Sequence, residues 1–284
     1  MHIKNIIPDF LALYDRENDF RSPDLEAYIN AHPTVFDQYF PIHCPKTEVR
    51  LQAAIEKYPA KKEEIRLISN HLPNIIKEVE IEYNEIFHLD LALQYKLMVG
   101  TFGSNAFVTR DNKREIYFAA EKLSSEIEHL KVIVAHEIGH VAHFTFATHQ
   151  GMDWEKVDWM HGLTTLYTEG AATYLSKKTV PGLHESVYFT YDNEGNPWVA
   201  FYEENKKEVK KRFLEDVVSG WDMGKEREWF RLSGGTYFGH NRLGYLVGTE
   251  YVEHLVERVG EAQALTFWVG HDVKKDILAW LNHY

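Results

Sequence analysis

The chain has 284 residues, and 44% of them are hydrophobic, so it can fill the core of one large domain or of two smaller ones. Its formal charge of -12 at pH 7 argues against nucleic acid and anionic membrane surfaces as main partners, because both require basic patches. The single cysteine, Cys44, excludes an intramolecular disulfide and a cysteine-rich zinc site.

The first residues do not resemble a secretory signal. Pro8 and Asp9 interrupt the apolar run that such a signal needs, and no later run approaches the length of a membrane span. A chain with one cysteine also suits a reducing compartment. We therefore expect a soluble cytoplasmic protein in which Cys44 is an ordinary, partly buried thiol.

Residues 1–96 are expected to form a mostly helical N-terminal region. A helix-start signal lies at residues 22–26, and a charged, periodic stretch runs from Thr47 to about Glu85. Five prolines are expected to divide this region into several helices. They are Pro33, Pro41, Pro45, Pro59 and Pro73.

Short β-like runs follow the helical region, at residues 96–99, 106–109 and 115–119. Turns are expected at Gly100, Gly103 and Asp111–Asn112. These runs predict a small antiparallel sheet directly before the next helix. The last strand is expected at its edge, where an extended peptide could add as a further strand.

The rest of the chain is expected to be helical, apart from one hairpin. Helices are predicted from after residue 126 to about Phe146 and from about Leu163 to Lys178, the second ending at Pro181–Gly182. Residues 186–201 read as a hairpin that precedes a charged helix over 203–218, so residues 182–220 could be an insertion. A Gly-rich loop at 233–235 leads to a helix over 242–259 and a short helical tail.

The most informative pattern is H-E-x-x-H, formed by His136, Glu137 and His140 within an apolar, helical segment. Positions i and i+4 share one face of a helix, so the two imidazoles can bind one zinc ion. Glu137 can then act as a general base on the attacking water. The pattern predicts one arm of a metallopeptidase site.

A catalytic zinc site needs a third protein ligand, and Glu169 on the following helix is the first candidate. His143 extends the same face, but ligands at i, i+4 and i+7 spread too far along one helix axis, so a supporting or packing role is expected. His149, Asp153 and Asp158 are rival candidates, with surface or capping roles the commoner explanation for the two aspartates.

H-E-x-x-H followed by Glu169–Gly170 on a later helix resembles the gluzincin superfamily of zinc peptidases. The chain is also similar to the bacterial YjaZ-like zinc peptidases. This narrower resemblance is carried by Tyr28–Ile29 with His32–Pro33, by Gly103–Asn105 and by Gly244–Gly248. The resemblance implies an α+β, predominantly helical, zincin-like (thermolysin-like) core over residues 97–284. Gly103–Ala106 would then be either a substrate-binding loop or an ordinary turn between strands.

The same resemblance implies His136, His140 and Glu169 as ligands of one zinc ion per chain, with Glu137 as general base and then acid. It also implies an oxyanion donor, for which Tyr245 is the first choice. The alternatives are a core aromatic role for Tyr245, and Tyr237, His240 or Arg242 as the donor.

The leading hypothesis is a zinc-dependent peptidase that acts on peptides or a protein. A second hypothesis keeps the zinc in a non-catalytic regulatory or interaction module, and a third is a metal-free helical interaction protein. An intact Glu137 favours the first hypothesis, because a binding site does not need a base. The sequence indicates neither the substrate, nor endo- or exopeptidase action, nor the oligomeric state.

Overall fold

The structure is a computed structural model that describes residues 1–16, 20–109 and 114–283. It contains two compact units, Met1–Glu137 and Ile138–Tyr284. The division falls inside helix α5 (Ile127–His149), which carries the H-E-x-x-H motif. No helix within the described ranges is long and apolar enough to cross a membrane.

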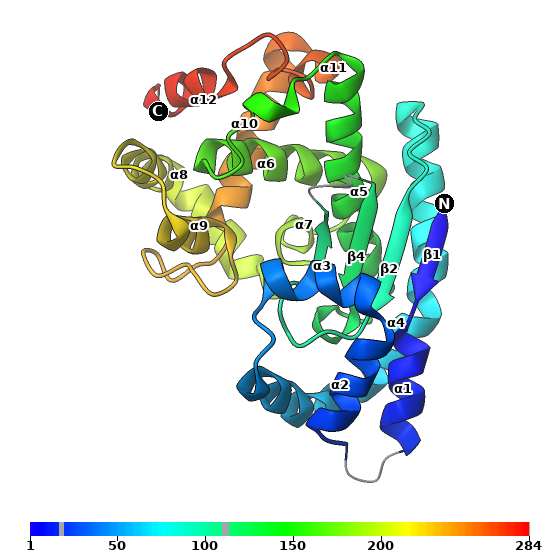
Figure 1. The fold of residues 1–284 in the computed structure, drawn as a ribbon. Helices are drawn as coiled ribbons and strands as arrows, with labels where there is room; N and C mark the ends of the chain where they lie inside the picture. The colour runs from blue at the N-terminus through cyan, green and yellow to red at the C-terminus, as the bar shows by residue number, and fades with distance from the viewer. Residues whose placement is uncertain (17–19, 110–113, 284) are drawn as a thin grey trace. The chain divides into compact units, whose positions relative to one another are not determined.

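The first unit contains a four-stranded mixed sheet (Figure 1). Its strands are β1 (His2–Asn5), β2 (Gln94–Met98), β3 (Ala106–Val108) and β4 (Glu115–Ala119), in the order β1-β2-β4-β3. The β1–β2 and β2–β4 pairs are parallel, and only β3–β4 is antiparallel. The prediction of an antiparallel sheet was therefore wrong for two of these pairs, and β1 was not predicted.

Strand β4 lies inside the sheet, between β2 and β3. The last four of its five residues are buried, as expected for a strand covered on both faces. The prediction that residues 115–119 form the edge was wrong, because β2 continues the sheet on the far side of β4. The turn expected at Asp111–Asn112 lies outside the described residues.

Between β1 and β2 the chain forms the helices α1 (Ile7–Arg16), α2 (Ser22–Ala31), α3 (Pro33–His43) and α4 (Glu48–Phe87). Helix α4 has 40 residues and continues through Pro59 and Pro73, so the prediction that these prolines end helices was wrong. A proline inside a helix costs about 3 kcal/mol. Burial of the α4 face that includes Ile65, Ile68 and Leu72 offsets this cost.

Helix α4 makes hydrogen bonds from both of its halves to other segments of the first unit. The hydroxyl of Tyr58 donates to the carbonyl of Gly100 over 2.7 Å. The hydroxyl of Tyr83 donates to the carbonyl of Ala135 over 2.6 Å, directly before the motif on α5. One continuous helix thus holds both the loop after β2 and the start of the motif.

The loop after β2 is held by buried polar groups. Glu121, in the 3-10 helix η1 (Ala120–Lys122), accepts hydrogen bonds from the backbone N–H groups of Gly100 and Phe102. The hydroxyl of Tyr39 accepts from the N–H of Gly103. Cys44 is buried beside this loop, as an ordinary thiol would be. The assignment of residues 103–106 as a substrate loop stays a prediction.

The second unit is helical in the residues that are described. Besides the end of α5 it contains the 3-10 helix η2 (Trp154–Lys156) and the α-helices α6 (Gly162–Thr179), α7 (Val187–Thr190), α8 (Asn196–Val218), α9 (Met223–Phe230), α10 (Leu243–Val259), α11 (Glu261–Ala264) and α12 (Val273–Asn282). The predicted hairpin over 186–201 was wrong, because these residues form α7 and the start of α8. A proline in the first turn, Pro197, favours helix there.

Helices α6 and α10 pack together with their backbones in contact (Figure 1). A Cβ atom on Gly170 would lie 2.2 Å from the carbonyl oxygen of Gly248, and one on Gly248 would lie 2.4 Å from the carbonyl oxygen of Leu166. Gly170 therefore contacts the backbone of α10 directly. The crossing fixes the residue before Gly170, which is Glu169.

Candidate metal centre

Helix α5 presents two of the three predicted ligands from adjacent turns. His136 is 1% exposed, and the side chain of His140 is 13% exposed. Both lie among buried apolar positions of the helix, which include Val132, Ile133 and Val141. An apolar setting fixes the imidazoles and leaves little water to compete for a bound ion.

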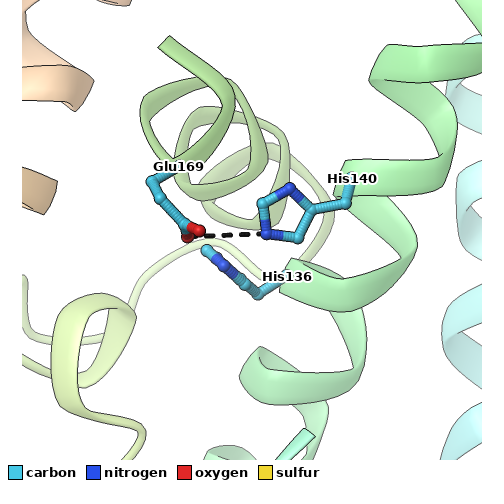
Figure 2. Close-up of side chains that lie close together, drawn as sticks. All are labelled: His136, His140 and Glu169. Atoms are coloured by element: carbon cyan, nitrogen blue, oxygen red, sulfur yellow. Dashed lines mark ion pairs between the residues drawn. The ribbon is translucent and has the colours of Figure 1, made fainter. Parts of the chain in front are cut away.

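Helix α6 presents the third predicted ligand. His161 caps the start of α6, since its Nδ1 accepts from the N–H of Leu163. Two turns further on, the Oε2 of Glu169 lies 3.5 Å from the Nε2 of His140. One ligand atom from each of His136, His140 and Glu169 lies within 4.8 Å of the others, and Figure 2 shows Glu169 pointing toward the two histidines.

This donor set fits a divalent cation. Two imidazole nitrogens and one carboxylate oxygen form the triad of many catalytic zinc sites, in which a fourth position stays open. Tetrahedral coordination at about 2.0–2.1 Å puts ligand atoms roughly 3.3 Å apart. The 3.5 Å separation between His140 and Glu169 is close to this value. The same donors also suit manganese, iron and cobalt, so the geometry does not by itself select the ion.

Glu137 lies between the two histidines in sequence and is 7% exposed. A carboxylate that is almost buried on the motif helix is placed differently from the many solvated glutamates of this chain. Its position on α5, one residue after the predicted ligand His136, is the one the motif predicts for a base.

The rival ligands lie outside this group. His143 is fully buried, its ring stacks on Trp268 with centroids 4.6 Å apart, and burial lowers its pKa from 6.5 to about 3. Asp153 accepts from the N–H of Glu155 and Asp158 from the N–H of Met160. His149 is exposed at the end of α5. His143 is thus a packing residue, and the aspartates hold turns, as the commoner explanations expected.

Tyr245 contacts the candidate ligand Glu169. It lies three residues before Gly248, at the crossing of α10 with α6, and its hydroxyl hydrogen-bonds to the Glu169 carboxylate. Burial raises the pKa of Tyr245, and the negative charge of Glu169 raises it further. The phenol therefore stays protonated and can donate to the carboxylate.

The alternative donors named with Tyr245 occupy different surroundings. Tyr237 is 44% exposed, and the guanidinium of Arg212 lies over its ring at 4.1 Å. The ring of His240 lies 4.5 Å from that of Phe201. Arg242 is buried, and its guanidinium lies 5.3 Å from the centre of the Tyr245 ring.

Sequence reasoning missed Glu226, on α9. Its carboxylate accepts hydrogen bonds from the hydroxyl of Thr165 and the indole N–H of Trp221. Burial raises its pKa, and the nearby charge of Glu169 adds to the effect. Nothing in the sequence distinguishes Glu226 from the other glutamates of its charged segment.

Comparisons of the chain with protein-family models, with curated proteins and with solved structures gave no match.

Proposed function

We propose that the protein is a zinc-dependent peptidase of the gluzincin type, which hydrolyses peptide bonds in a peptide or protein substrate. The proposal is carried by the grouping of His136, His140 and Glu169, with their ligand atoms within 4.8 Å of one another. The motif could have placed two histidines on one helix without a third ligand. Helix α6 brings the Glu169 carboxylate beside the two imidazoles, which supports Glu169 as the third ligand.

When bound, a zinc ion supplies a Lewis acid that makes a nearby water more acidic and polarises a carbonyl group. Glu137 takes the proton from the attacking water and later gives it to the leaving amine. Burial suits both steps, because a carboxylate shielded from bulk water keeps the proton close to the reacting atoms. Retention of a base beside the ligands favours hydrolysis over a purely structural metal site.

We propose two alternative roles for Tyr245 in this chemistry. As an oxyanion donor, its hydroxyl would stabilise charge that develops during attack. As a positioning residue, it would orient Glu169, and its hydrogen bond to that carboxylate supports this second role. A positioning role predicts weaker zinc binding when the hydroxyl is removed, whereas an oxyanion role predicts a lower kcat.

The test is Glu137→Gln, which keeps the shape of the side chain and removes the base. We expect this variant to bind one zinc ion per chain like the wild type and to lose hydrolysis of a diverse peptide library by about 100-fold or more. The matched control is Glu128→Gln, the same change at an exposed position of the same helix. Full activity of Glu137→Gln would contradict the mechanism.

A non-catalytic zinc-binding regulatory module is the alternative. It predicts that His136→Ala, His140→Ala and Glu169→Ala lose zinc, while no peptide is cleaved by the wild type. Metal analysis of the purified protein combined with the peptide library, with and without a chelator, separates the alternatives. Zinc without hydrolysis supports the module, and hydrolysis that the chelator abolishes supports the peptidase.

A further inference from the structure

Arg242 is a buried cation at the start of helix α10. The residue is 7% exposed and has left-handed backbone geometry, with φ of 55°. Its Nη1 donates to the carbonyl oxygen of Phe189 over 2.8 Å. The guanidinium lies over the rings of Tyr191 and Tyr245, at 5.2 and 5.3 Å from their centres.

No carboxylate neutralises this cation among the residues that the structure describes. Arg242 forms no ion pair there, and its Nε is shielded from water without a hydrogen-bond acceptor. The one hydrogen bond found uses Nη1, so the edge formed by Nε and Nη2 has no acceptor in the same residues. A buried charge without a counter-ion is costly, and two aromatic faces compensate it only in part.

The backbone adds positive potential at the same place. Helix α10 has 17 residues, begins directly after Arg242 and has no side-chain cap at its N-terminus. Unsatisfied N–H groups at a helix start carry a partial positive charge. A buried guanidinium beside such a terminus is a setting that favours an anion.

This setting adjoins the candidate metal centre within the second unit. The Tyr245 ring contacts the Arg242 guanidinium, while the Tyr245 hydroxyl bonds to Glu169. One aromatic side chain thus separates the cation from a predicted ligand. A peptide held at the centre could place an anionic group at Arg242 within the length of a residue or two.

We propose that Arg242 binds a carboxylate of the peptide substrate. The inference rests on the proposed peptidase function and assigns it a substrate class. The Nε and Nη2 edge of the guanidinium offers two parallel N–H donors, which fit the two oxygens of a carboxylate. A carboxylate also supplies the negative charge that would neutralise the buried guanidinium. Two sources share this chemistry, namely the C-terminal carboxylate of a short peptide and an acidic side chain.

The experiment compares matched synthetic peptides with one another as substrates of the zinc-loaded protein. Each sequence is made as the free C-terminal acid and as the amide, and with Glu or Gln at an internal position. We expect kcat/KM to favour the carboxylate member of one pair by about tenfold or more. A free-acid preference identifies the C-terminus as the source, and a Glu preference identifies the side chain.

Arg242→Met should abolish this preference. Arg242→Lys should retain part of it, because lysine keeps the positive charge but lacks the paired N–H donors of the guanidinium. Arg258→Met is the control, because it removes a cation at the other end of α10 that pairs with Asp276. Circular dichroism shows whether each variant is folded. A wild type that treats both pairs equally, or a folded Arg242→Met that keeps the preference, would overturn the inference.

A binding measurement separates failure of this inference from failure of the peptidase proposal. Metal-free protein is titrated by NMR with N-acetyl-Phe-Ala, N-acetyl-Phe-Ala amide, N-acetyl-Glu-Ala amide and N-acetyl-Gln-Ala amide. If no peptide is ever hydrolysed, the peptidase proposal fails. A carboxylate preference in binding that Arg242→Met removes would still uphold the anion site, and equal or absent binding of all four probes would refute it.

Discussion

Replacing Gly170 with alanine tests whether the crossing of α6 with α10 fixes the predicted metal ligand Glu169. The added Cβ would lie 2.2 Å from the carbonyl oxygen of Gly248, whereas ordinary contacts begin at 3.4 Å. The helices must therefore part locally by about 1.2 Å, because backbone rather than a flexible side chain stands in the way. Glu169 is the neighbouring residue and must move with this segment.

The expected effect on stability is smaller than the effect on metal binding. Overpacking costs about 1–3 kcal/mol, and the better helix propensity of alanine returns roughly 1 kcal/mol, so the net loss is about 0–2 kcal/mol. Disturbing the support of a metal ligand weakens affinity by about 10- to 100-fold. We therefore expect Gly170→Ala to fold but to bind zinc at least about tenfold more weakly.

Zinc affinity is measured by competition with a chromogenic chelator, and stability by urea unfolding of the metal-free protein. Gly224→Ala is the matched control, since its Cβ would meet only a side-chain oxygen of Asp222, at 3.1 Å. That variant should keep the wild-type affinity. A folded Gly170→Ala protein with wild-type zinc affinity would refute the argument that backbone contact at this crossing positions Glu169.

Two further predictions concern buried neighbours of the centre. For Tyr245→Phe, a positioning role predicts about tenfold weaker zinc binding with activity restored by excess zinc, whereas an oxyanion role predicts unchanged affinity and a kcat about 100-fold lower. In the folded protein the pKa of His143 is lowered from 6.5 to about 3. Between these two pH values the unfolded chain therefore binds a proton at His143 that the folded chain does not. The free energy of unfolding of the metal-free protein should therefore fall as pH falls from 6.5 toward 3, by at most about 5 kcal/mol. Urea unfolding at several pH values should show a smaller fall for His143→Phe. The same pH dependence in the wild type and the variant would contradict this prediction.

The grouping of His136, His140 and Glu169 agrees with the sequence prediction, and its two-histidine half depends on local helical geometry alone. His136 and His140 share a face on any helix, and the pattern around Glu169 predicted a helix whose observed bounds are Gly162–Thr179. What could not be predicted was which helix supports Glu169. The contact of Gly170 with Gly248 joins residues far apart in sequence, and the periodicity of neither helix reveals its partner.

The errors share a physical cause, because in each a local signal was outweighed by packing. Pro59 and Pro73 are strong helix breakers in isolation, but the buried face of α4 holds one helix across both. Residues 186–201 were predicted to form a hairpin, but they form α7 and the start of α8. The short connections among residues 96–119 favoured antiparallel pairing, yet β2 pairs in parallel with β4 while β3 takes the outer position.

The hydrogen bonds from the two halves of α4 require Tyr58 and Tyr83 to keep a fixed rotation about the helix axis relative to each other. Tyr58 reaches the carbonyl of Gly100, and Tyr83 reaches the carbonyl of Ala135. Each residue of an α-helix turns the next by about 100°. Inserting or deleting one residue between the two tyrosines would rotate one hydroxyl away from its acceptor, so both bonds could not form. Helix α4 therefore tolerates substitution along its exposed face far better than any change in its length.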